Sequence, residues 1–186
     1  MIKKKWRVFI ASTDKDLKYA RASIAEKIEA LGFETVIFER GSFVIDPELH
    51  SHDTCLRSVE TSDILLLILD KRSGGPYRGK KGNPSITEKE YETAINNNIP
   101  VIVLVNQRLE QERFDRIGKI RETYPKISDK ELLSRFKYLV ENAYIEAMIG
   151  LAKISSRLLF LAYFSNLSAS SVLLTLASHF FTKLIP

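Results

Sequence analysis

The sequence contains little cysteine and histidine. Cys55 is the only cysteine among 186 residues, so the chain cannot close a disulfide within itself or build a thiolate metal site from its own residues. His50 and His52 lie in a polar stretch without a cysteine or third histidine at ligand spacing, which argues against metal binding. A single free thiol fits a reducing compartment, so we expect a cytoplasmic protein with no metal and no resident cofactor.

Several familiar motifs are also missing. The chain starts with basic residues, but Arg7 and the charged run 14–16 interrupt any apolar h-region, so we expect no secretion signal. The sequence has no P-loop and no G-x-G-x-x-G fingerprint, and no serine, histidine and aspartate stand in a nucleophile-elbow context. These absences argue against P-loop nucleotide hydrolysis, Rossmann-type dinucleotide binding and serine hydrolase chemistry.

The charge pattern gives no sign of nucleic-acid binding. The net charge is +5, but basic residues are mixed with acidic ones except at 3–7 and 71–81. Both clusters fit a solvated surface better than a patch that follows phosphates, so no nucleic-acid partner is expected. A chain with 45% hydrophobic and 27% charged residues should fold, and its length suits one domain with an extension.

The chain does contain an alternation of apolar strands and amphipathic helices. The uninterrupted apolar run 64–69 must be covered on both faces, as the centre of a parallel sheet is. Gly32 stands where a helix end favours a left-handed residue, and Ser85 to Glu88 has the form of a capping box. We expect strands at 8–11, 35–38, 64–69 and 101–105, and helices at 16–31, through 55–59 and from 85 to about 96.

This alternation predicts an α/β fold of the flavodoxin type, with a parallel sheet and helices on both faces. The ligand crevice of such a fold lies at the carboxyl ends of the strands, which are here Ser12, Glu39, Asp70 and Asn106. A charged helix at 109–124 and a capping box at 128–131 follow. We therefore divide the chain into an α/β domain at 1–106, a charged helical extension at 107–147 and an apolar helical hairpin at 148–186.

The apolar end of the chain allows two interpretations. Residues 158–182 contain no Lys, Arg, Asp or Glu and are long enough to cross a bilayer. Their centre, 165–171, is polar and would be unfavourable at the membrane midplane, so a hinge between helices at 151–164 and 170–182 fits better. Such a hairpin would cap the domain or join copies into a homo-oligomer, and a membrane hairpin is the alternative.

Glu90 is the most informative single residue. Because each helical residue turns by about 100°, Glu88 and Glu92 share one side of the expected helix. Glu90 lies instead in the row of Ile86 and Ala94, beside the apolar face. A partly desolvated carboxylate at a crevice can orient a sugar hydroxyl, stabilise an oxocarbenium ion or attack an anomeric carbon. The other interpretation is a boundary residue that pairs with a nearby lysine or arginine.

Three ordered motifs resemble a bacterial domain family of unknown function that is related to TIR domains. They are V-F-I-A-S-T-D-K-D-L at 8–17, C-L-x-x-V-E-x-x-D-I at 55–64 and S-I-T-E-x-E-Y-x-x-A at 85–94. In TIR domains that cleave NAD and in nucleoside 2-deoxyribosyltransferases, a glutamate lies early in the helix before the last core strand. Glu90, followed by Ala94 and the strand at 101–105, matches that pattern. The resemblance implies that Glu90 is the catalytic residue of N-glycosidic bond cleavage.

The resemblance also implies ligand contacts in the first loop and in the third helix. Ser12 and Thr13 look like first-loop residues that hold phosphate or ribose, helped by the positive end of the helix that follows. An N-cap role alone would also explain them. Ser85 is similar to a residue that lines the pocket near the glutamate, although helix capping alone would account for it.

A third group of contacts is implied after the core strand. The family tends to read L-G-x-R-Y-G where this chain has L-D-K-R-S-G at 69–74, so Arg72 matches and Asp70 departs. Asp70 places a carboxylate at a strand end, where the nucleoside transferases also use an aspartate. The departure at Ser73 removes an aromatic ring, for which Tyr77 is the nearest substitute. Arg72 and its basic neighbours could hold a diphosphate.

These patterns lead to three functional hypotheses. The first is a TIR-type NAD glycohydrolase in bacterial defence or signalling, with NAD as substrate rather than cofactor. The second is a non-catalytic TIR-like interaction or oligomerisation module. The third is an enzyme similar to the nucleoside deoxyribosyltransferases, which would also take a nucleotide or nucleoside as its small-molecule partner.

Overall fold

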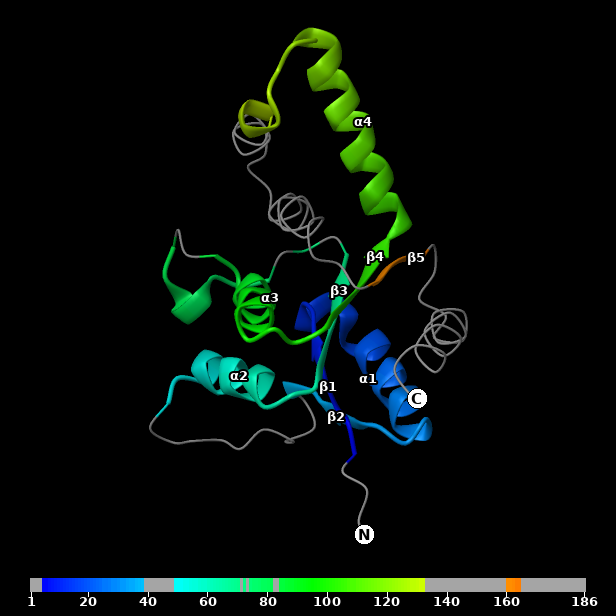
Figure 1. Cartoon of the computed structure of the whole chain (residues 1–186), viewed down its shortest axis with the longest axis vertical. Coiled ribbons are helices and arrows are strands. Elements are labelled where there is room, and N and C mark those ends of the chain that lie inside the picture. Colours follow the sequence, from blue (N-terminus) through cyan, green and yellow to red (C-terminus); the bar gives the residue numbers. More distant parts are fainter. Residues whose placement is uncertain are drawn as a thin grey trace.

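The computed structural model describes residues 5–38, 49–70, 72, 74–81, 84–132 and 160–164. They form one parallel sheet in the order β2-β1-β3-β4-β5 (Figure 1). This is the strand order of flavodoxin-like folds, so the predicted fold class is confirmed. The strands are β1 (Arg7–Ala11), β2 (Glu34–Val36), β3 (Ile64–Leu69), β4 (Val101–Asn106) and β5 (Phe160–Phe164).

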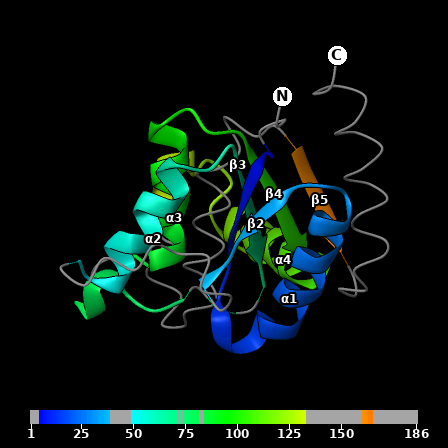
Figure 2. The ribbon, with the colours of Figure 1, turned by 90° about the horizontal axis from the view of Figure 1, so that it is seen from below.

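Helices lie on both faces of the sheet, as Figure 2 shows. The helix α1 (Asp14–Ala30) covers one face, and α2 (Ser51–Glu60) and α3 (Ile86–Asn96) lie together over the other. A 3₁₀ turn, η2 (Tyr77–Gly79), precedes α3. The helix α4 (Gln107–Thr123) continues from the end of β4 and points away from the sheet (Figure 1).

The core is divided into two layers by β3, whose six residues are all buried. Successive side chains of a strand point to opposite faces, so its apolar run serves both layers at once. Leu65 and Leu67 pack in the layer that contains Val59 of α2 and Ala94 of α3. Leu66 belongs to the other layer, together with residues of α1. The prediction that 64–69 is a central strand is therefore confirmed.

The ends of α1 follow from the local sequence. Thr13 is the N-cap residue and has extended backbone angles, after which α1 runs for 17 residues. Gly32 has a φ of 91°, a conformation that costs glycine little because it has no Cβ. The predicted left-handed residue at this helix end is confirmed, and it returns the chain towards β2.

The structure corrects one expectation about the end of the chain. A helix was expected over 151–164, but Phe160–Phe164 form β5, which pairs in parallel with β4. Phe and Tyr favour strands, and β4 without β5 would present an unpaired edge of backbone groups. The sheet thus includes residues beyond 106, where the α/β domain was expected to end.

The remainder of the expected apolar hairpin at 148–186 lies outside the described residues. The same holds for most of the candidate membrane segment at 158–182, of which only β5 is described. Within the ranges that the structure covers, no helix is both long and apolar enough to cross a membrane.

Candidate active site

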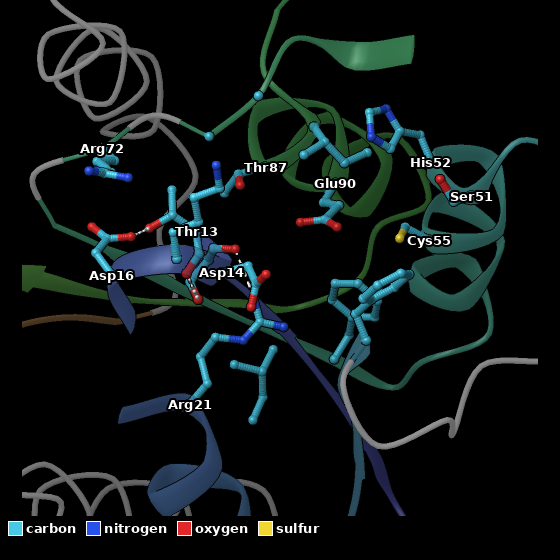
Figure 3. A pocket seen from close by; sticks show the side chains of 18 residues that line it. Thr13, Asp14, Asp16, Arg21, Ser51, His52, Cys55, Arg72, Thr87 and Glu90 are labelled. Carbon is cyan, nitrogen blue, oxygen red and sulfur yellow. Dashed lines mark hydrogen bonds between the residues drawn. The ribbon is translucent and has the colours of Figure 1, made fainter. Parts of the chain in front are cut away.

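A pocket of about 560 Å³ opens at the carboxyl end of β1 (Figure 3). Flavodoxin-like folds bind their ligands at this end of the sheet. The pocket walls come from the loop between β1 and α1, from α2, from the loop after β3 and from α3. The lining side chains include polar Ser12, Thr13, Asp14, Lys15, Asp16, Arg21, Ser51, His52, Arg72, Thr87 and Glu90, and apolar Phe9, Ile10, Phe38, Cys55 and Ile86.

Four of the six residues singled out in the sequence lie together in this pocket. Ser12 and Thr13 enter from the first loop, Arg72 from the loop after β3 and Glu90 from α3. In Figure 3, Thr13, Arg72 and Glu90 are seen around the same space. Residues separated by as much as 78 positions in the sequence are thus brought to one site, since Ser12 and Glu90 both line it.

Asp70 and Ser85 do not line the pocket. The Asp70 carboxylate accepts a hydrogen bond from Nδ2 of Asn106, at 2.8 Å, so the two strand ends bind each other. Ser85 is buried, and its hydroxyl accepts a hydrogen bond from the backbone N–H of Glu88, at 3.1 Å. Ser85 is therefore the N-cap of α3, which places Glu90 on the second turn of that helix.

Glu90 is a buried carboxyl group, with 7% of its surface exposed. Burial raises the pKa of Glu90 to about 8, and the positive charge of Arg21 opposes that rise. The group therefore exchanges its proton close to neutral pH, whereas an exposed glutamate would be fully ionised there. A carboxyl group with such a pKa in an open pocket is suited to acid–base or nucleophilic chemistry.

The first loop has a geometry that leaves its hydroxyls near the pocket. Thr13 caps α1 by position, but its side chain accepts no hydrogen bond from the helix backbone. Its hydroxyl donates to the Asp16 carboxylate instead. Ser12 donates only a long hydrogen bond, of 3.4 Å, to the Thr13 carbonyl. Side-chain capping thus does not explain why hydroxyl residues occupy this loop.

Arg21 and Phe38 line the pocket but were not anticipated from the sequence as site residues. Arg21 of α1 is buried, yet it lies in the same helical row as Leu17 and Ile28. A charged residue in an apolar row is the same signal that singled out Glu90, so Arg21 was detectable. Phe38 is 57% exposed and places an aromatic ring at the pocket. A lone aromatic after a strand carries no such signal.

Thr87 and Cys55 complete the buried wall. Thr87 lies three residues before Glu90, and its hydroxyl is buried without a hydrogen-bond partner among the described residues. A Cβ on Gly74 would come within 3.2 Å of that hydroxyl, so the loop after β3 passes close to α3. Burial and the charge of Glu90 raise the pKa of the Cys55 thiol to about 12, against an opposing effect of Arg21.

The segment 74–78, called the rim here, lines the pocket through Gly74 and Gly75 and is fastened to both α2 and α3. Ile86 donates its backbone N–H to the Gly75 carbonyl at 3.0 Å, and Pro76 forms a bridge with Ser85. At η2, the Arg78 guanidinium donates to the Asp53 carboxylate at 2.6 Å, and the Tyr77 hydroxyl donates to the same group. These hydrogen bonds lower the pKa of Asp53.

Tyr77 therefore has a structural role and does not replace the aromatic ring that is missing at Ser73. Its ring stacks on His52 with a centroid distance of 5.8 Å, and Tyr77 does not line the pocket. Phe38 instead supplies an exposed aromatic side chain to the pocket, next to the buried Phe9. In the described parts of the chain, no cluster of three His, Cys, Asp or Glu side chains could hold a metal ion.

Solved structures share this architecture. A conserved protein from Enterococcus faecalis is 15% identical, and the match covers 95% of this chain and 99% of that protein with a TM-score of 0.53. The TIR domains of the activated Roq1 resistosome, which directly recognises the pathogen effector XopQ, are 12% identical. That match covers 95% of this chain and 99% of the TIR chain, also with a TM-score of 0.53. A CMP N-glycosidase from Clostridium botulinum, BcmB, is 13% identical over 92% of this chain and 98% of that enzyme, with a TM-score of 0.48.

The chain thus folds as an α/β domain with the architecture of TIR domains. The chain belongs to the family described as a domain of unknown function, DUF4062, whose family model matches residues 7–156. No curated protein matches the sequence. The expectation of a domain family of unknown function is confirmed, and the likeness to TIR domains is one of fold.

Proposed function

We propose that this protein cleaves the N-glycosidic bond of a nucleotide, with NAD as the substrate and Glu90 as the catalytic residue. The observation that carries the proposal is the buried Glu90 carboxyl in an open pocket at the carboxyl end of β1. Burial holds the pKa of Glu90 at about 8, so its carboxylate is poorly solvated and reactive once it forms. The TIR-like architecture and the sequence motifs around Glu90 support the same chemistry.

The reaction requires little from the protein beyond charge and position. The bond between C1′ of the ribose and the pyridinium nitrogen breaks, and nicotinamide leaves as a neutral molecule with the bonding electron pair. The Glu90 carboxylate stabilises the oxocarbenium ion or bonds to C1′. Water then adds its oxygen to C1′ and releases a proton, and any bond between Glu90 and C1′ breaks with its electron pair returning to the carboxylate. The product is ADP-ribose. Ser12, Thr13 and the exposed Arg72 would hold the ribose and the diphosphate.

The first prediction is that the purified protein at high concentration consumes NAD and that Glu90→Gln abolishes this activity. The variant keeps the shape of the side chain but cannot form a carboxylate. Because the pKa of Glu90 is about 8, the rate of the parent protein should rise with pH up to that value. Chromatography of nicotinamide and ADP-ribose formed over time measures the activity.

The matched control is Glu92→Gln. Glu92 lies on the same helix, but its partly exposed carboxylate pairs with Lys89 at 2.7 Å and is absent from the pocket. This variant should keep the activity of the parent. Loss of activity in both variants would show that the change disturbs α3 rather than the chemistry.

Two other outcomes would point to the other hypotheses. Exchange of bases between nucleosides without NAD consumption would indicate an enzyme similar to the deoxyribosyltransferases. No turnover of either substrate, together with stable oligomers, would favour a non-catalytic interaction module.

A further inference from the structure

Arg21 and Glu90 are the two buried side chains with a formal charge among the described residues. They are 5% and 7% exposed, respectively. They come from helices on opposite faces of the sheet, since α1 packs in one core layer and α3 in the other. Both side chains nevertheless line the same pocket at the end of β1 (Figure 3). Each core layer therefore contributes one buried charged side chain to the pocket.

Arg21 is also attached to the first loop. Its Nη1 donates a hydrogen bond of 2.9 Å to the backbone carbonyl of Ser12, the residue that follows β1. This bond fixes both the guanidinium and the loop that presents Ser12 and Thr13 to the pocket. Because an arginine side chain does not lose its proton in proteins, the positive charge at this position is permanent.

The charge of Arg21 acts on its neighbours in the pocket. Burial raises the pKa of Glu90, and Arg21 is the group that opposes this effect. The pKa of Cys55 is subject to the same opposition, because burial and the charge of Glu90 raise it and the charge of Arg21 lowers it. Little water screens charges in a buried site, so the charge of Arg21 reaches both groups, although burial has the larger effect on each pKa.

We propose that Arg21 is the positioning residue of this site: its charge favours ionisation of the Glu90 carboxyl against the effect of burial, and its hydrogen bond fixes the Ser12 loop at the same pocket. The catalytic part of this inference rests on the proposed function, in which the Glu90 carboxylate faces C1′. The effect of Arg21 on the ionisation of Glu90 does not depend on that function and can be tested without turnover.

Other charged and titratable groups also face the pocket. Asp14, Lys15 and Asp16 belong to the first turn of α1, His52 to α2 and Arg72 to the loop after β3. Asp14, Lys15, Asp16 and Arg72 are exposed, so water and salt screen their charges. Arg21 is the buried cation of the site, so we expect its charge to affect the ionisation of Glu90 more than these exposed groups do.

The test compares Arg21→Gln with Arg21→Lys. The glutamine variant keeps an N–H donor but loses the charge, and the lysine variant keeps the charge. Protein labelled with ¹³C at the glutamate carboxyl is titrated by NMR, and Glu90→Gln assigns the Glu90 signal. We expect Arg21→Gln to raise the titration midpoint of Glu90 by about one pH unit or more, and Arg21→Lys to leave it close to that of the parent.

The kinetic counterpart is the pH profile of NAD consumption. At pH 7, Arg21→Gln should lower kcat/KM by about tenfold, because one pH unit in the midpoint removes about nine tenths of the remaining carboxylate. The activity should recover as the pH is raised. A merely structural role would lower the rate at every pH without moving the profile.

The proposal is overturned if Glu90 titrates at the same pH in Arg21→Gln as in the parent. It is also overturned if Arg72→Gln, which removes an exposed cation of the same pocket, raises the midpoint more than Arg21→Gln does. Should Arg21→Gln fail to fold, a raised midpoint in Arg21→Lys would overturn the proposal by itself. A parent protein that titrates as expected but consumes no NAD would refute the proposed function and leave the effect of Arg21 on the ionisation of Glu90 supported.

Discussion

At the scale of single residues, ionisation of the buried Glu90 carboxyl lowers the stability of the folded protein. Glu90 has a pKa of about 8 in the folded protein, whereas an unfolded glutamate titrates near 4.5. Between these values the folded protein binds one proton more than the unfolded chain. Its stability therefore falls as the pH rises from 4.5 to 8, by up to about 1.4 kcal/mol per pH unit.

This leads to a prediction about stability. Glu90→Gln removes the titrating group, so its free energy of unfolding relative to the parent should increase between pH 5 and pH 8. Urea unfolding of both proteins at the two pH values measures the difference. The same difference in stability at pH 5 and pH 8 would mean that Glu90 ionises as an exposed glutamate does. Glu92→Gln again serves as the control and should show no such trend, since its partner Lys89 is exposed to solvent.

Residue patterns in the sequence predicted part of the site. The offset of Glu90 from Glu88 and Glu92 placed it on the buried side of α3, where the structure has it. Asp70 was chosen because it ends a core strand, but Asn106 at the end of the next strand binds its carboxylate. Which polar groups bind each other across two strands depends on register, and the sequence does not contain that information.

At the scale of elements, α3 is the part that positions the catalytic candidate. Its beginning is fixed by Ser85, whose hydroxyl accepts the Glu88 N–H, as the S-x-x-E pattern predicted. The second S-x-x-E pattern is confirmed in the same way, because Ser128 accepts from the Glu131 N–H at 3.3 Å. The two serines differ in their surroundings, since Ser85 is buried and Ser128 is exposed.

We predict that Ser85→Ala destabilises the protein by about 1 kcal/mol or more, because it removes a buried capping hydroxyl from a partly buried N–H. It should also lower NAD consumption. The first turn of α3 binds the rim through Ile86 and positions Glu90 on the next turn, so a frayed first turn would disturb both. Ser128→Ala is the matched control and should cost less, because water can replace the lost hydrogen bond. Urea unfolding and the NAD assay measure the two effects. Equal losses in both variants would contradict a special role of the buried cap.

Elements with strong periodicity were predictable, and β5 was not. The apolar runs of β3 and β4 have the length of strands and follow turn residues, which makes them recognisable. The stretch F-L-A-Y-F at 160–164 is short and apolar throughout, so it fits a buried helix and a strand equally well. Its conformation is decided by pairing with β4, which is more than 50 residues earlier in the chain.

At the scale of the whole molecule, the pairing of β5 with β4 gives residues after 147 a role in the sheet. A chain that ends at residue 147 would leave the V-I-V-L-V edge of β4 unpaired. Such an edge is a template for pairing with other chains. We predict that this truncated protein aggregates or self-associates, which size-exclusion chromatography with light scattering would detect. A monodisperse truncated monomer would instead support the expectation that the last residues drive oligomer formation.

The rim formed by residues 74–78 bears on the kinetics of ligand binding. It is tied to α3 through Gly75 and the Pro76 bridge, and to α2 through the contacts of η2 with Asp53. The conformational entropy of these residues is thus lost during folding and not when a ligand arrives. The association rate should then be set by diffusion and by the attraction of the exposed Arg72 for an anion, without a slow ordering step along this wall.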